Sequence, residues 1–144
     1  MQAHPASLDR NWAMAAHLSA LVAVAGLPFG HVIGPLVVYL IKGNESEFVS
    51  LHAKASLNYQ ITISIVGFIA IILAFAGWFW FVFNAAVDQT PHHFYAYPIL
   101  LCWIALMAAI VLILLISVVF IIMGTVAASN GQTYKYPFAV TFLR

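Results

Sequence analysis

The chain has 144 residues and a formal net charge of +1; 65% of its residues are hydrophobic and only 6% are charged. So few charges exclude a nucleic-acid-binding face, and so much apolar surface cannot be hidden by a soluble chain of this length. We therefore predict a single all-α integral membrane domain over residues 1–144, with the lipid bilayer as its first partner and no nucleic acid. Because Cys102 is the only cysteine, no intrachain disulfide is possible.

The charged residues leave three charge-free stretches, Asn11–Ile41, Ala55–Val87 and Gln89–Tyr134. About 20 apolar residues cross the hydrocarbon layer of a bilayer, so each stretch is long enough to enter the membrane. The second and third predict long transmembrane helices over about residues 57–83 and 98–129.

The first stretch is interrupted by Leu27-Pro28-Phe29-Gly30 and by Gly34-Pro35, which predicts a helical hairpin over about residues 11–42. Its expected helices are Asn11–Leu27 and His31–Lys42. The second would rise only about 18 Å, so the hairpin is either re-entrant and shielded by protein or lies in a locally thinned bilayer. Its start also imitates a signal peptide that ends at Ala23-Val24-Ala25, but we expect the segment to be retained.

Local signals place the ends of the other helices. Residues 44–56 predict an amphipathic interfacial segment, in which Asn44 has capping-box spacing to Glu47 and Ser46 is a rival N-cap. Pro98 suits the first turn of the last helix, and Asn130-Gly131 suits a left-handed C-cap. The aromatic run Trp78–Phe83 suits a membrane interface.

The basic residues predict the topology. If the first stretch is a hairpin, all of them lie on one side of the membrane, and the far side holds Asp88 without any Lys or Arg. By the positive-inside rule, we expect a multi-pass protein of a bacterial inner membrane with both termini cytoplasmic. The basic residues are Arg10, Lys42, Lys54, Lys135 and Arg144.

Polar side chains at membrane depth need partners and therefore mark candidate sites. Asn58 and Thr62 stand four residues apart on one predicted helix face, and so do Gln60 and Ser64. They could join helices, dock a partner or line a polar pathway, and small residues such as Gly124 and Ala128 could pack the monomer or another subunit. The candidate partner or packing site consists of His17, His52, Asn58, Gln60 and Thr62.

We expect no catalytic residue, no cofactor and no metal site. The sequence has no nucleophile-elbow serine, no HExxH and no glycine-rich phosphate loop, so we predict that it is not an enzyme. The adjacent histidines of Pro91-His92-His93 lack a spacing that closes a tetrahedral metal site. No acid or base lies deep in a predicted span, which argues against a proton-coupled transporter.

Four segments in order resemble the bacterial Tic-twenty-like family: Trp12–Ser19, Gly34–Val38, Phe48–Gln60 and Asn130–Pro137. The resemblance runs from about Leu8 to Leu143 and implies small inner-membrane proteins with four helices. It implies that relatives include magnetosome-membrane proteins linked to crystal growth, and it assigns no catalytic or ligand residues. Neither Trp78–Phe83 nor the far-side histidines belong to the pattern.

These observations favour a small non-enzymatic membrane protein that binds, scaffolds or helps assemble partner membrane proteins, or that self-associates. A protein translocation or insertion component is the main alternative, and rests on the family analogy. A channel or small-solute transporter is a further one.

Overall fold

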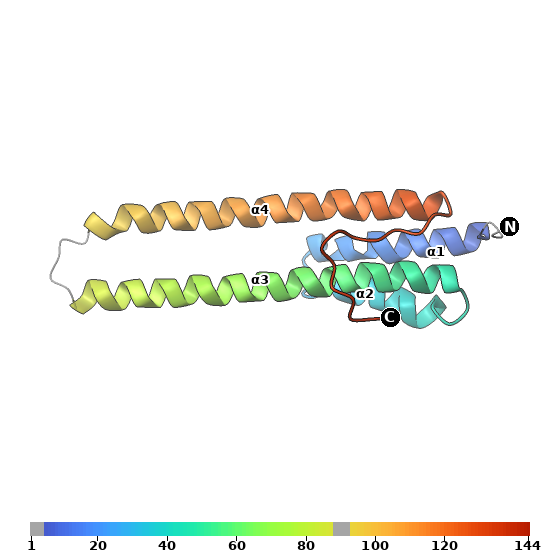
Figure 1. Ribbon diagram of the computed structural model, residues 1–144, viewed down its shortest axis with the longest axis horizontal. Coiled ribbons are helices and arrows are strands. Elements are labelled where there is room, and N and C mark those ends of the chain that lie inside the picture. Colours follow the sequence, from blue (N-terminus) through green and yellow to red (C-terminus); the bar gives the residue numbers. More distant parts are fainter. Residues whose placement is uncertain (1–4, 88–92) are drawn as a thin grey trace. The chain divides into compact units, whose positions relative to one another are not determined.

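The structure is a computed structural model that describes residues 5–87 and 93–144, and within these it contains only helices (Figure 1). The predicted all-α class is confirmed. The chain forms two compact units. Unit 1 comprises the residues up to Ser64 together with Ser117–Arg144, and unit 2 comprises Ile65–Ile116. The elements are α1 (Ser7–Leu18), the 3₁₀ helix η1 (Ser19–Ala25), α2 (Gly30–Lys42), α3 (Glu47–Val87) and α4 (His93–Ser129).

In unit 1 the chain turns back on itself, and α2 packs along α1 and η1. The turn uses left-handed backbone at Gly26 (φ 88°) and at Phe29 (φ 58°). The expectation of one α-helix over Asn11–Leu27 was wrong, because the α-helix begins at Ser7 and gives way after Leu18 to the tighter 3₁₀ helix. The change occurs where α2 approaches most closely: a Cβ on Gly34 would overlap the main chain of Ser19. The backbone contact at Gly34 thus sets the spacing of the hairpin.

α3 is one continuous helix of 41 residues, which includes most of the predicted interfacial segment and all of the predicted span over residues 57–83. No Gly or Pro occurs between Glu47 and Val66, so nothing in the sequence interrupts the helix there. Its N-cap is Ser46, whose hydroxyl accepts a hydrogen bond from the Val49 N–H at 3.4 Å. Of the two predicted caps, the structure therefore uses Ser46.

α4 begins at His93, five residues before the predicted start, so Pro98 lies inside the helix and its first-turn assignment was wrong. Pro98 lies beyond the first turn, so the helix loses one intrahelical hydrogen bond there, to the carbonyl of residue 94. The predicted C-cap is confirmed. Gly131 has φ 70°, and the N–H groups of Gly131 and Gln132 bond to Ala128 and Ala127 as in a Schellman motif.

Two helical segments, Glu47–Asn84 and Tyr97–Ser129, are long and apolar enough to cross a membrane. They contain the two long spans predicted from sequence. The apolar helix α2 is shorter, and whether the hairpin is re-entrant or spanning stays a prediction.

The core of unit 1 is built from small and β-branched residues, which lets the helices approach closely. Ala16 of α1, Val38 of α2 and the pair Val49 and Ala53 of α3 form one buried cluster. Trp12, Ala15 and Tyr39 pack around it. This core brings the N-terminal part of α3 against the hairpin and so positions the polar side chains described next.

Candidate functional site

The centre of the polar site is His17 on α1, a fully buried side chain that bonds through both ring nitrogens. Its Nδ1 lies 2.8 Å from the hydroxyl of Tyr136, and its Nε2 lies 2.8 Å from Nδ1 of His52 on α3. His52 is equally buried, and the two imidazole rings meet edge to face. Two of the predicted site residues therefore contact each other, and a residue of the C-terminal segment completes the row. We call His17, His52 and Tyr136 the histidine cluster.

The proton positions in the histidine cluster are linked, because a neutral imidazole donates through one nitrogen and accepts through the other. If Tyr136 donates to His17, then His17 donates to His52, and His52 carries its own proton on Nε2. If His52 donates to His17 instead, then His17 donates to Tyr136. The main chain of Gln132 interacts with the His52 ring, although Nε2 of His52 makes no hydrogen bond of good geometry within the described residues.

Aromatic residues and a glycine enclose the cluster. A Cβ on Gly124 of α4 would lie 2.9 Å from Nδ1 of His17, so the absent side chain makes room for the ring. Tyr59 stacks on Tyr136 with ring centroids 4.4 Å apart, and its hydroxyl lies 2.9 Å from that of Ser117. Burial raises the pKa of the Tyr136 phenol, which therefore stays protonated. The cluster thus joins α1, α3, α4 and the C-terminal segment.

Asn58 and Thr62 bind the main chain of the C-terminal segment. The Asn58 amide donates to the Leu143 carbonyl at 3.0 Å and accepts from the N–H groups of Phe142 and Leu143 at 3.0 and 2.8 Å. The Thr62 hydroxyl donates to the main-chain carbonyl of Asn58 at 2.7 Å and accepts from the Val140 N–H at 3.0 Å. The predicted pair on one helix face therefore holds an extended segment in place.

Gln60, the fifth predicted residue, is not brought into these contacts. Its side chain is buried, and within the described residues its Nε2 has no hydrogen-bond partner. The main-chain carbonyl of Gln60 accepts a hydrogen bond from the Ser64 hydroxyl at 2.8 Å. That hydroxyl also lies 2.7 Å from Nε2 of His31. The Gln60–Ser64 pair thus connects α3 to the start of α2 through Ser64.

Sequence reasoning missed Tyr136, Tyr59 and Gly124 as parts of this site. Tyr136 lies in the segment Asn130–Pro137, which contributes only to the family resemblance. Gly124 is predicted only as a small residue that packs helices together. A signal was present, because a buried tyrosine needs a partner for its hydroxyl. The partner itself is 119 residues away in the chain, so local pattern could not name it.

The described residues contain no group of three or more His, Cys, Asp or Glu side chains placed to share a metal ion. Asp88 and His92 lie outside the described residues, and so does the side chain of His93. The predicted far-side loop with Asp88 and the adjacent histidines therefore lies outside the described residues.

The two long apolar helices and the buried polar packing of unit 1 define a small helical membrane protein. Comparison with known families makes the assignment more specific: residues 8–143 match the magnetosome magnetite crystal formation protein family, and the chain belongs to it. The Tic-twenty-like label is not supported by this match, whereas the magnetosome relatives implied by the resemblance are. Neither the curated proteins nor the solved structures contain a significant match.

Proposed function

We propose that this chain is a small non-enzymatic integral membrane protein that binds, scaffolds or helps assemble partner membrane proteins during magnetite crystal formation. The family supplies the process, because its description names magnetite crystal formation. The structure supplies the observation that supports the scaffolding role. His17 bonds to His52 and Tyr136, and Asn58 and Thr62 bond to the main chain of the C-terminal segment, so polar side chains tie the elements of unit 1 together.

That observation favours a scaffold over a polar pathway. A channel or transporter needs polar groups that face a substrate, and such groups are usually exposed to a cavity. Here His17 and His52 are buried, and each bonds to a residue from another element. These side chains therefore support a rigid unit 1.

A crosslinking experiment tests the partner role. A photoreactive amino acid replaces an exposed residue of unit 2, Phe79 or Trp80, or an exposed residue of unit 1, Leu8 or Phe138. The matched control places the probe at Leu57, which is buried in unit 1. We expect at least one exposed position to crosslink to a defined membrane protein in intact membranes, and the control to give none. Lipid adducts alone at every exposed position would contradict a scaffold.

The cellular test is deletion of the gene in a cell that forms such crystals. We expect fewer or smaller crystals by electron microscopy, restored by the wild-type chain. Substrate flux or conductance through the purified protein in liposomes would instead favour the channel alternative.

We also propose that the protein lies in a bacterial inner membrane with both termini cytoplasmic. The five basic residues support this orientation through the positive-inside rule. Reporter fusions after Lys42 and after Arg144 are expected to report the cytoplasm, and a fusion near Asp88 the far side. A fusion after Lys42 on the far side would overturn the orientation.

A further inference from the structure

The basic residues of the chain differ in the partners that they meet. Lys42 forms an ion pair with Glu45, and Arg10 donates to the carbonyl of Ser129 at 3.4 Å. The other three, Lys54, Lys135 and Arg144, form no ion pair with an Asp or Glu side chain among the described residues. Lys54 donates to the main-chain oxygen of Arg144 at 2.9 Å and lies 5.7 Å from the centre of the Tyr39 ring. Among the described residues, no acidic side chain thus neutralises these three positive charges.

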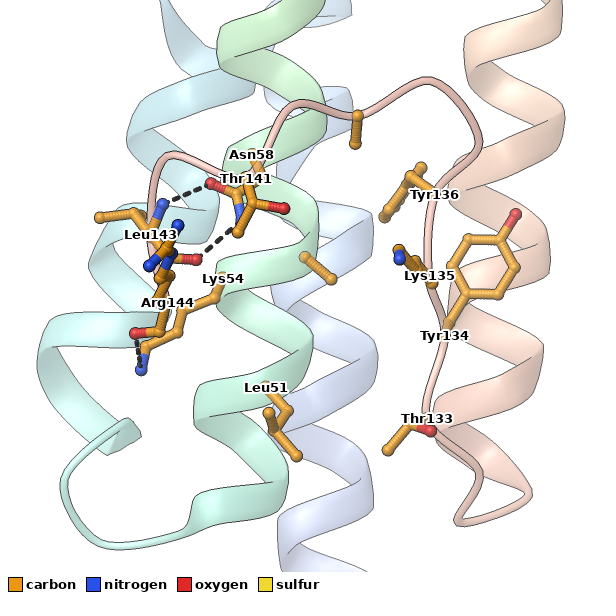
Figure 2. A pocket seen from close by; sticks show the side chains of 12 residues that line it. Leu51, Lys54, Asn58, Thr133, Tyr134, Lys135, Tyr136, Thr141, Leu143 and Arg144 are labelled. Carbon is orange, nitrogen blue, oxygen red and sulfur yellow. Dashed lines mark hydrogen bonds between the residues drawn. The ribbon is translucent and has the colours of Figure 1, made fainter.

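These three residues line one cavity of about 410 Å³ between α3 and the C-terminal segment (Figure 2). The other polar residues of its lining include Asn58, Thr133 and Thr141, and none of the lining residues is acidic. Two of the chain's acids, Asp9 and Glu47, line a different cavity. The cavity beside the C-terminal segment therefore combines positive charge with hydroxyl and amide groups.

The fold holds the charges together. Like charges repel, so an unconstrained segment that carries Lys135 and Arg144 would move away from Lys54. Asn58 and Thr62 bond to the main chain of residues 140, 142 and 143, which holds the Arg144 end of the segment beside α3. Figure 2 shows Lys54 and Arg144 next to each other beside these bonds. Because the hydrogen bonds of Asn58 and Thr62 position the C-terminal segment, the cationic side chains form a preorganised site for an anion.

We propose that this cavity binds a phosphate group through Lys54, Lys135 and Arg144. Ammonium and guanidinium groups are the usual ligands of phosphate, and hydroxyl and amide groups supply further donors. The phosphate belongs either to the headgroup of an anionic lipid or to free inorganic phosphate. Because Lys54 lies near the start of a segment long enough to span the membrane, a headgroup can reach it. The site is independent of the scaffold role proposed above.

The test uses the full chain purified in a neutral detergent and follows its melting temperature. The added probes are short-chain phosphatidylglycerol, short-chain phosphatidylcholine with the same acyl chains, and inorganic phosphate. We expect phosphatidylglycerol to raise the melting temperature of the wild type more than phosphatidylcholine does. The variant K54Q/K135Q/R144Q should need about tenfold more phosphatidylglycerol, or more, for the same rise. The matched control R10Q/K42Q, which removes the other two basic residues, should respond like the wild type.

The arms separate the two sources of phosphate. A rise with phosphatidylglycerol alone identifies a lipid headgroup, and an equal rise with inorganic phosphate identifies the free ion. Both support the site if the triple variant loses the response. Equal stabilisation by both lipids, no stabilisation by any probe, or an unchanged response of the triple variant would overturn the proposal. If the triple variant does not fold, K135Q replaces it, because Lys135 is exposed and its side chain forms no hydrogen bond within the described residues.

Discussion

Unit 1 and unit 2 stabilise their helices by different means. In unit 1, polar side chains from α1, α3 and the C-terminal segment bond across elements, and small residues bring the helices close. In unit 2, large apolar side chains such as Phe79, Trp80 and Leu101 are mostly exposed, and Trp78 meets Trp103 edge to face. Unit 1 therefore carries its own interior, whereas the apolar surface of unit 2 needs lipid or protein to cover it.

The largest expected effect is at the centre of unit 1. H17A removes a buried ring and leaves His52 and the Tyr136 hydroxyl without their partner. We expect a loss of about 3–5 kcal/mol in the free energy of unfolding, measured by chemical denaturation in detergent micelles. H31A, which removes one partly buried bond to Ser64, serves as the control and should cost less. Equal losses for the two variants would show that the histidine cluster is not central to unit 1.

A pair of glycine substitutions compares the two units directly. In G34A the new methyl group would overlap the main chain of Ser19, so the hairpin must open and we expect a loss of about 1–3 kcal/mol. In G67A of unit 2 the new methyl group has no atom within 4 Å apart from its chain neighbours and the backbone of its own helix. Because Ala has the higher helix propensity, that variant should gain up to about 1 kcal/mol. Thermal melting of both variants checks the opposite signs, and two losses of equal size would contradict the comparison.

The third prediction concerns the C-terminal segment. N58L removes three hydrogen bonds to residues 142 and 143, and we expect unit 1 to lose about 2 kcal/mol and the segment to detach. Hydrogen exchange of residues 139–144 should speed up. The control is N84L, because within the described residues the exposed Asn84 bonds to a main-chain carbonyl of its own helix and to no other element. A variant that keeps slow exchange but loses a crosslinked partner would instead make Asn58 a docking residue.

The smallest effect is expected within unit 2. Trp78 and Trp103 are joined by one edge-to-face contact with centroids 6.0 Å apart. A double-mutant cycle with W78L and W103L should give a coupling energy of about 0.5–1.5 kcal/mol. A coupling as large as the loss in H17A would mean that unit 2 is not the more weakly joined unit.

The same contrast explains what the sequence could predict. Composition and charge-free runs led to an all-α membrane chain with two long spans, because the bilayer itself imposes those lengths. Polar residues in apolar runs marked His17, His52, Asn58 and Thr62, since each needs a partner. The partners could not be derived, because Tyr136 and Leu143 lie far away in the chain. The end of α1 at Leu18 could not be derived either, because it lies beside the contact between Gly34 and Ser19. The start of α4 at His93 could not be derived because the helix continues through Pro98.

The contact between His17 and Tyr136 also has a consequence for synthesis. The two residues are 119 positions apart, so at about 5–20 residues per second the ribosome needs roughly 6–24 s after His17 before Tyr136 exists. During that interval His17 and His52 lack the third member of the histidine cluster. Unit 1 can therefore be completed only after the C-terminal segment has been synthesised.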